Sequence, residues 1–254
     1  MKKWSFLLSS LLISTAFATT PFYRFWRGYK SPHLTYLNFL EGMRNDFMSK
    51  TVTSAEHKGL IAYLPTLPPQ HIALPDEIAL VVYQTKAAYM KLLKDTDWQK
   101  YATLHWKYFD SKLSKSLKTE PLSGAMKNEH AYDVLQSSAN WQKGYAVCCI
   151  SKKLKQPDAY VRAMKTNYSP RFLTSYLILT TQNYVIEYQL WASKNAYKKN
   201  LETVEKMRRP YLHPFIGACQ PMQKTTIDRI EINYSEGINM QFHTTNSKLL
   251  RTSN

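Results

Sequence analysis

The chain has 254 residues, 44% of them hydrophobic, and 34 Lys and Arg against 18 Asp and Glu give it a formal net charge of +16. A chain of this length and composition can bury a large core, as one domain or as two halves that share an interface, and this argues against intrinsic disorder. With seven glycines, and no Gly-x-Ser-x-Gly, Gly-x-Gly-x-x-Gly or phosphate-loop pattern, hydrolase, Rossmann-type and kinase functions lose their main support.

The N-terminus has the pattern of a secretory signal peptide. A positively charged start precedes a short apolar run that ends at the small-x-small sequence Ala16-Phe17-Ala18. The run, about twelve residues, is shorter than the roughly 20 that a membrane-spanning helix needs. We therefore expect residues 1–18 to be removed, and the mature chain to be a bacterial periplasmic or secreted protein without a membrane span. A retained membrane anchor is the alternative.

The basic character remains after the signal is removed. Loss of its two lysines leaves 32 basic and 18 acidic residues, a charge of about +14. Such a surface favours an anionic partner, for example lipid headgroups or polysaccharide. No zinc-finger spacing, RNA-binding signature or continuous basic tract accompanies the charge, so we expect no specific nucleic-acid recognition. A solvated basic face without a partner is the alternative.

Hydrophobic periodicity predicts an alternation of strands and helices in the first part of the chain. The predicted elements are a strand over 22–27, a helix over 32–47 that begins at Ser31-Pro32, strands over 59–64 and 77–83 around a Pro-rich loop, and a helix from Lys86 that carries Trp98, Tyr101 and His105. Residues 111–140 fit less well. They form a connector with a possible short helix over 128–136, and a final strand of the first half is not resolved there.

The second part of the chain predicts the same order of elements. It consists of a strand over 141–150, a helix over 158–168, strands over 175–180 and 184–190, a helix from Lys194 to about Met207, and a last strand over 227–234 that a hairpin extends to Phe242. Both halves therefore read as strand, helix, strand, strand, helix. That order is typical of a ferredoxin-like fold.

An internal repeat at an offset of 108 residues supports this division. Seven pairs are identical between 86 and 105, where chance matches would give about one or two: Lys86 and Lys194, Ala88 and Ala196, Tyr89 and Tyr197, Lys91 and Lys199, Leu93 and Leu201, Leu104 and Leu212, His105 and His213. Upstream, Tyr83-Gln84 matches Tyr188-Gln189 if Leu190-Trp191-Ala192 is an insertion. The predicted organisation is a first half over 19–110, the connector over 111–140 and a second half over 141–254; a chance match is the alternative.

The sequence from Val185 to Tyr197, with Trp191 followed by Ala192-Ser193 and with His213 sixteen residues further on, resembles the antibiotic-biosynthesis-monooxygenase type of dimeric α/β barrel. The resemblance implies an α+β fold in which two ferredoxin-like βαββαβ halves of one chain form a pseudo-dimeric barrel, as a monomer or homodimer. It also implies a cavity between the sheet and the helices of each half. The superfamily includes cofactor-free oxygenases of polyphenols and haem enzymes as well as proteins without a known reaction, so it does not select an activity.

Two histidines are the first candidates for a ligand site. A histidine on a helix wall can be an axial haem ligand or a general base near neutral pH, and both His105 and His213 have aromatic neighbours. Haem is therefore a possible cofactor. The alternative is that both histidines complement helix dipoles and pack at equivalent places of the repeat.

Strand alternation adds further candidates. Within 22–27, Arg24 and Trp26 share one face, so an arginine can enter a cavity and bind a carboxylate; a pair with Glu77 or Glu187, or simple exposure, is the alternative. Glu187 itself is a possible buried base. The ligand-binding candidates are His105, His213, Trp191, Arg24, Trp26, Glu187, Tyr188 and Tyr83. We expect a small, flat or acidic ligand, with oxygenase activity and docking on an anionic surface as alternatives.

Three cysteines are too few for a disulfide framework in a chain of this length. Because neighbouring residues of a strand point to opposite faces, only one of Cys148 and Cys149 can reach Cys219. A bridge between Cys149 and Cys219 is the predicted pair, with buried thiols as the alternative. No metal site is expected, since no further ligand lies at suitable spacing.

Overall fold

The computed structural model of the chain describes residues 20–55, 57–68, 70–222, 229–234, 240–243 and 249–251, and it describes side chains as far as His213. The predicted signal peptide and the predicted hairpin turn after Tyr234 lie outside these residues. Among the described residues, no helix is both long enough and apolar enough to cross a membrane.

The first half is a ferredoxin-like unit, and its final strand lies within the predicted connector. Its elements are β1 (Phe22–Gly28), α1 (Tyr36–Gly42), the π-helix η1 (Met43–Phe47), α2 (Met48–Ala55), β2 (Leu60–Leu67), β3 (Glu77–Tyr83), α3 (Lys86–Leu92), α4 (Thr96–Ala102), α5 (Leu104–Tyr108) and β4 (Lys115–Pro121). The strands follow the order β2-β3-β1-β4, with every neighbouring pair antiparallel.

The second half repeats this unit. Its elements are β6 (Tyr145–Lys153), α6 (Asp158–Asn167), β7 (Leu173–Thr180), β8 (Tyr184–Trp191), α7 (Lys194–Arg208) and β9 (Leu212–Met222). The strand order is β7-β8-β6-β9, again antiparallel throughout, so each strand has a counterpart at the same place in the first half. The predicted α+β fold of two βαββαβ halves is confirmed.

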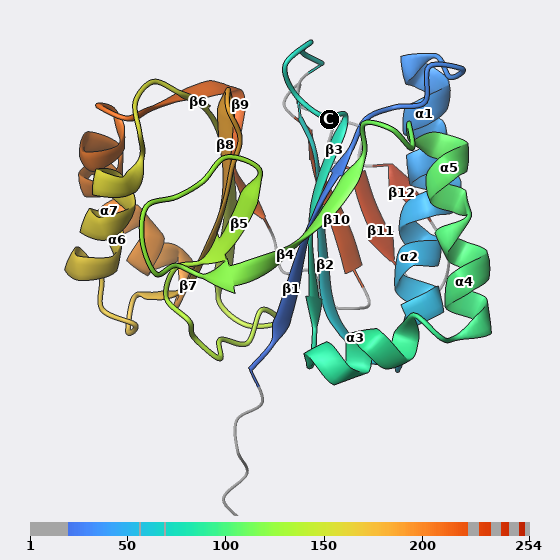
Figure 1. Cartoon of the computed structure of the whole chain (residues 1–254), viewed down its shortest axis with the longest axis horizontal. Helices are drawn as coiled ribbons and strands as arrows, with labels where there is room; N and C mark the ends of the chain where they lie inside the picture. Colours follow the sequence, from blue (N-terminus) through green and yellow to red (C-terminus); the bar gives the residue numbers. More distant parts are fainter. Residues whose placement is uncertain are drawn as a thin grey trace, which may run out of the picture.

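One short strand joins the two sheets into one, and three more extend the sheet beyond β2. β5 (His130–Asp133) lies between β4 and β7, and β10 (Arg229–Tyr234) pairs with β2 and continues into β11 (Met240–His243) and β12 (Leu249–Arg251). The sheet curls so that the two halves face each other over a shared core, while the helices cover the outer faces (Figure 1). Phe25 and Leu80 of the first half meet Ile186 and Tyr188 of the second in that core.

Several predicted boundaries are wrong, each for a local reason. The first helix begins at Tyr36 rather than at Pro32, because the Thr35 side chain caps it by accepting a hydrogen bond from the backbone N–H of Asn38. The predicted short helix over 128–136 is instead strand β5, since its backbone pairs with β4 and β7. The final strand of the second unit is β9, which contains His213, whereas the strand predicted over 227–234 is present as β10 and pairs with β11 in antiparallel orientation.

The repeat is visible in the helix caps. Thr85 accepts a hydrogen bond from the N–H of Ala88, and Ser193 accepts the equivalent bond from Ala196. The offset of 108 continues backwards through β3 and β8 without a gap, so the counterpart of Tyr83 is Trp191, and the predicted insertion before Ser193 is wrong.

Aromatic packing confirms this alignment. In the first half Tyr83 lies opposite Phe22 on β1, and Tyr89 packs on both rings at centroid distances of 4.9 and 5.1 Å. In the second half Trp191 lies opposite Tyr145, and Tyr197 packs on both at 5.7 and 5.5 Å. The two halves thus keep the same three-ring cluster at the point where a strand leads into a helix.

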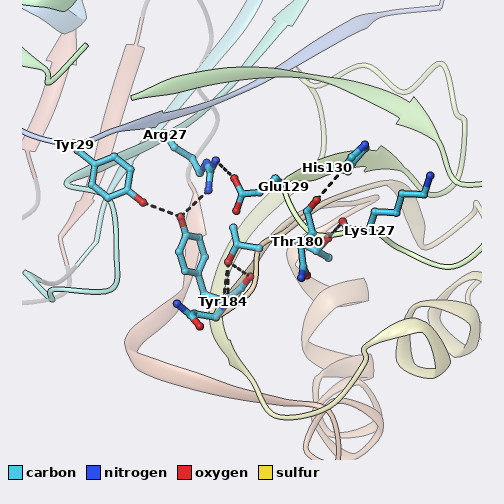
Figure 2. A network of polar contacts seen from close by, with 10 residues as sticks. Arg27, Tyr29, Lys127, Glu129, His130, Thr180 and Tyr184 are labelled. Atoms are coloured by element: carbon cyan, nitrogen blue, oxygen red, sulfur yellow. Dashed lines mark hydrogen bonds and ion pairs between the residues drawn. The ribbon is translucent and has the colours of Figure 1, made fainter. Parts of the chain in front are cut away.

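A polar network connects the halves at the rim of the shared core (Figure 2). The buried guanidinium of Arg27 forms an ion pair with Glu129, and its Nη1 donates to the Tyr184 hydroxyl at 3.1 Å. Tyr184 also shares a hydrogen bond of 3.2 Å with Tyr29. Because the backbone N–H of Glu129 donates to the Thr180 carbonyl, the carboxylate is fixed where it compensates the buried charge.

Candidate functional site

A cavity of about 440 Å³ lies in the first half, between the outer face of the sheet and the helices. Its wall is mainly aromatic, with a few polar groups. The lining residues are Arg24, Trp26, Phe47, Thr51, Tyr63, Val81, Tyr83, Tyr89, Trp98, Gln99, Tyr101, Ala102, Thr103, His105, Trp106, Ser114 and Ser116. Its size and its apolar wall with convergent polar groups are those of a small-molecule site.

Strand alternation decides which side chains reach this cavity. On β1, Tyr23 and Phe25 point into the shared core, so Arg24 and Trp26 point outward, towards the helices. On β3 the residue opposite Arg24 is Val81, which also lines the cavity. The predicted sharing of one face by Arg24 and Trp26 is therefore observed.

Arg24 brings a positive charge to the cavity. Its Nε donates to the Ser116 hydroxyl at 3.0 Å, its Nη2 donates to the Ser116 carbonyl at 3.1 Å, and the guanidinium lies 5.1 Å from the centroid of the Tyr89 ring. These contacts orient the side chain and use only part of its donors, because a guanidinium carries five N–H groups. The remaining donors suit a carboxylate or another oxygen acceptor.

His105 is a neutral imidazole within an aromatic group. Burial lowers the pKa of His105 to about 4, and the hydrogen bond with the Ala102 carbonyl opposes the shift. Trp26, Phe47 and Tyr101 surround the ring at centroid distances of 4.8, 4.9 and 5.2 Å. Nδ1 lies 3.2 Å from the carbonyl oxygen, so this nitrogen carries the proton and Nε2 is the basic one.

A buried carboxylate lies behind the aromatic wall. The Tyr63 hydroxyl donates to Oε1 of Glu77 at 2.5 Å, and the Glu77 side chain is completely buried. Burial raises the pKa of Glu77 to about 7, and the bond from Tyr63 opposes the shift. In the sequence analysis Glu77 appears only as a partner for an arginine. A glutamate at the start of an otherwise apolar strand is the sequence feature that could have indicated a buried carboxyl group.

In the second half, the described counterparts of two cavity-wall residues are buried and bonded to each other. Val81 and Tyr83 of the cavity wall correspond to Gln189 and Trp191, which are buried, and the indole N–H of Trp191 donates to Gln189 at 3.1 Å. Glu187 forms an ion pair of 2.7 Å with Arg208. The predicted candidates Trp191 and Glu187 therefore belong to the packed core of the second half.

Two other predicted residues also lie away from the cavity. Tyr188 points into the shared core, where its hydroxyl donates to the Leu64 carbonyl at 3.0 Å. His213 is exposed on β9 opposite Lys152, whereas His105 lies on α5, so the two histidines are not equivalent and the predicted helix position of His213 is wrong. The cavity brings together Arg24, Trp26, Tyr83 and His105 from the predicted set.

The predicted disulfide pair is opposed in the backbone. Cys149 on β6 is the register partner of Cys219 on β9, while Cys148 pairs with Gln220. The Cys219 side chain lies outside the described residues, so the bridge stays a prediction. Among the described residues, no group of three or more His, Cys, Asp or Glu side chains is arranged to hold a metal ion.

Comparison with known proteins yields similarities of structure. No protein-family model and no curated protein matches the sequence. A candidate monooxygenase from Lactobacillus acidophilus NCFM is similar at 11% identity and a TM-score of 0.42, over 80% of this chain and 91% of that one. An anthrone oxidase-like protein is similar at 9% identity and a TM-score of 0.36, over 82% of this chain and 93% of that one. SnoaB, a cofactor-independent oxygenase from Streptomyces nogalater, is similar at 11% identity and a TM-score of 0.28, over 42% of this chain and 96% of that one.

The fold assignment itself rests on the strand order and register.

Proposed function

We propose that the first half of this chain binds a small, flat aromatic molecule with an acidic or carbonyl oxygen, and that the second half serves as its structural counterpart. The observation that carries the proposal is the cavity of about 440 Å³ with an aromatic wall and Arg24 at one side. Aromatic side chains bind flat ligands by offset or edge-to-face stacking, and an oriented guanidinium binds an oxygen acceptor through paired N–H groups.

Equilibrium dialysis with 2-naphthoate, a flat aromatic carboxylate, tests the proposal. We expect saturable binding to the wild-type chain. Ala102→Phe places a ring in the cavity and should abolish it, while Arg24→Gln removes the guanidinium and should weaken it about tenfold. Phe172→Ala, an exposed position of the second half, is the control and should bind as the wild type does. Equal binding by the Ala102→Phe variant would place the ligand elsewhere and overturn the proposal.

A second candidate function is oxygenation of the bound molecule, with or without haem, and the neutral His105 favours it. The lone pair on Nε2 of a neutral imidazole in an aromatic wall can accept a hydrogen bond from an acidic ligand. The hydrogen bond at Nδ1 is also the support that a haem-ligating histidine receives from its surroundings. An optical spectrum of the purified chain, with and without added haem, together with oxygen consumption in the presence of the bound molecule, tests this function.

Export and surface docking remain separate proposals. Export rests on the N-terminal pattern and is tested by the N-terminal sequence of the mature protein, for which we expect a start near Thr19. Docking of the basic exterior on an anionic surface rests on the net charge, and it predicts that binding to anionic vesicles weakens steeply as salt is raised.

A further inference from the structure

Each half carries a buried glutamate that accepts a hydrogen bond from a tyrosine of the neighbouring strand. Tyr63 lies opposite Val81, and Tyr176 lies opposite Gln189, so the offset of 108 makes the two tyrosines equivalent. Tyr63 donates to Oε1 of Glu77 at 2.5 Å, and Tyr176 donates to Oε1 of Glu187 at 2.8 Å. The two tyrosines are therefore equivalent, but the two glutamates are not. At the same offset Glu77 corresponds to Val185 and Glu187 to Ala79, so the carboxyl groups lie two positions apart along their strands.

The two pairs differ in how the carboxylate is compensated. Glu187 has the guanidinium of Arg208 at 2.7 Å and accepts a second hydroxyl, from Tyr160, at 2.9 Å. Glu77 takes part in none of the ion pairs found among the described side chains. The Glu187 pair is thus a structural network, while the Glu77 carboxylate is buried without a counter-charge.

The Glu77 pair borders the cavity and the Glu187 pair does not. Tyr63 lines the cavity, and Glu77 lies directly behind it. A tyrosine hydroxyl has one hydrogen, so when that hydrogen is on the bond to Glu77, only the oxygen lone pairs of Tyr63 are left for a ligand. When Glu77 carries a proton of its own, the carboxylic acid can donate to the Tyr63 oxygen, and the Tyr63 hydrogen becomes free to point into the cavity.

We propose, on the basis of the ligand site described above, that Glu77 acts through Tyr63 to set the hydrogen-bond polarity of the cavity wall. With Glu77 ionised, Tyr63 accepts a hydrogen bond from the ligand, so the site favours an aromatic ligand with an N–H or O–H donor. With Glu77 protonated, Tyr63 donates, and the preference for a donor-bearing ligand disappears. Glu77 is a positioning residue in this scheme, because it touches Tyr63 and not the ligand.

The surroundings of Glu77 leave it as the group that titrates near neutrality. Tyr63, Tyr101 and Tyr188 face it from β2, α4 and β8, and burial raises the pKa of each well above its usual range. His105 on the opposite wall has a pKa lowered to about 4 by burial. Between about pH 5.5 and 8.5 these groups keep one protonation state, while Glu77, with a pKa of about 7, changes.

Indole and benzofuran form a probe pair suited to this inference. Both are flat, bicyclic and of nearly the same shape, neither titrates in the working range, and they differ in an N–H donor against a ring oxygen. At about pH 8.5, where Glu77 is ionised, we expect the wild-type chain to bind indole about tenfold more tightly than benzofuran. At about pH 5.5, where Glu77 is protonated, we expect this preference to be lost. Equilibrium dialysis over this range gives the ratio of the two dissociation constants.

Two variants and one matched control complete the experiment. Glu77→Gln keeps the shape of the side chain and should make the ratio independent of pH, and Tyr63→Phe should bring it close to one at every pH. Tyr176→Phe removes the equivalent hydroxyl in the second half, where Tyr160 and Arg208 still hold Glu187, and should reproduce the wild-type profile.

A wild-type ratio that does not change with pH, with both probes bound, would overturn the inference and leave the ligand site standing. The same follows if Glu77→Gln keeps the wild-type pH profile. If 2-naphthoate binds and both probes fail to bind, the inference is contradicted and the ligand site still stands. If 2-naphthoate fails to bind as well, the proposed function is contradicted, and the inference with it.

Discussion

Tyr63 and Tyr176 occupy equivalent places in the two halves, and each donates a hydrogen bond to a buried glutamate, yet only Tyr63 lines a cavity. In the second half Arg208 compensates the carboxylate, and Gln189 and Trp191 fill the adjoining space. Among the described residues, the two halves thus differ in the packing beside equivalent tyrosines.

The ion pair between Arg208 and Glu187 is expected to stabilise the second half. Both side chains are almost fully buried, so removal of the cation leaves an uncompensated charge in the core. We expect Arg208→Met to lower the free energy of unfolding by about 3 to 5 kcal/mol, measured by urea denaturation. Its neighbour Arg209 is exposed, and Arg209→Met should change stability by less than about 0.5 kcal/mol. A similar small effect of both variants would contradict the assignment.

Glu77 should make the protein less stable as pH rises. Its pKa is raised from 4.5 to about 7 by burial, so the folded state keeps a proton that the unfolded state has already released. The stabilisation is complete below about pH 4.5 and is lost as pH rises through about 7, by about 3 kcal/mol in total. Compared with the wild type, Glu77→Gln should remove this slope in urea denaturation at several pH values. If the free energy of unfolding varies with pH in the same way for both proteins, the pKa of Glu77 is not raised in the folded state.

His105 should act in the opposite direction. Because burial lowers its pKa from 6.5 to about 4, the unfolded state takes up a proton first as the solution is acidified. The contribution of neutral His105 is therefore complete above about pH 6.5 and is lost as pH falls through about 4. His105→Gln should flatten the acid limb of the stability curve. His130→Gln, at an exposed position, is the control and should leave that limb unchanged.

Cys149 and Cys219 should form a disulfide in protein taken from an oxidising compartment. Their backbones are register partners on the adjacent strands β6 and β9. Intact mass spectrometry without reductant should find a mass about two daltons below that of the reduced chain. The deficit should disappear in Cys149→Ser and persist in Cys148→Ser. Persistence in the Cys149 variant would assign the bridge to Cys148.

The sequence predicted the fold well because its signals are local and repeated. Alternation along 77–83 and 184–190, and the Thr85 and Ser193 caps, are properties of neighbouring residues, so they are visible without a structure. β5 was missed because its strand character comes from pairing with β4 and β7, which lie elsewhere in the sequence. β9 was missed for a related reason, since Pro214 and Pro221 weaken its strand pattern.

The site was predicted only in part. Arg24, Trp26 and His105 were found from strand alternation and residue chemistry, and they line the cavity. The repeat suggested equal roles for His105 and His213. In the structure His105 lies on the short helix α5 and His213 lies on strand β9, so their surroundings differ. Trp191 is buried, whereas Tyr83 borders the cavity. This difference depends on how side chains pack across three elements, so it cannot be predicted from a local sequence pattern.

A crystal structure of the signal-free chain grown with 2-naphthoate tests the central claim most directly. We expect the naphthyl ring within the cavity of the first half, against its aromatic wall, with its carboxylate on Arg24, and no ligand at the corresponding place beside Trp191. A ligand bound only outside this cavity, or a cavity found closed by its own side chains, would contradict the account.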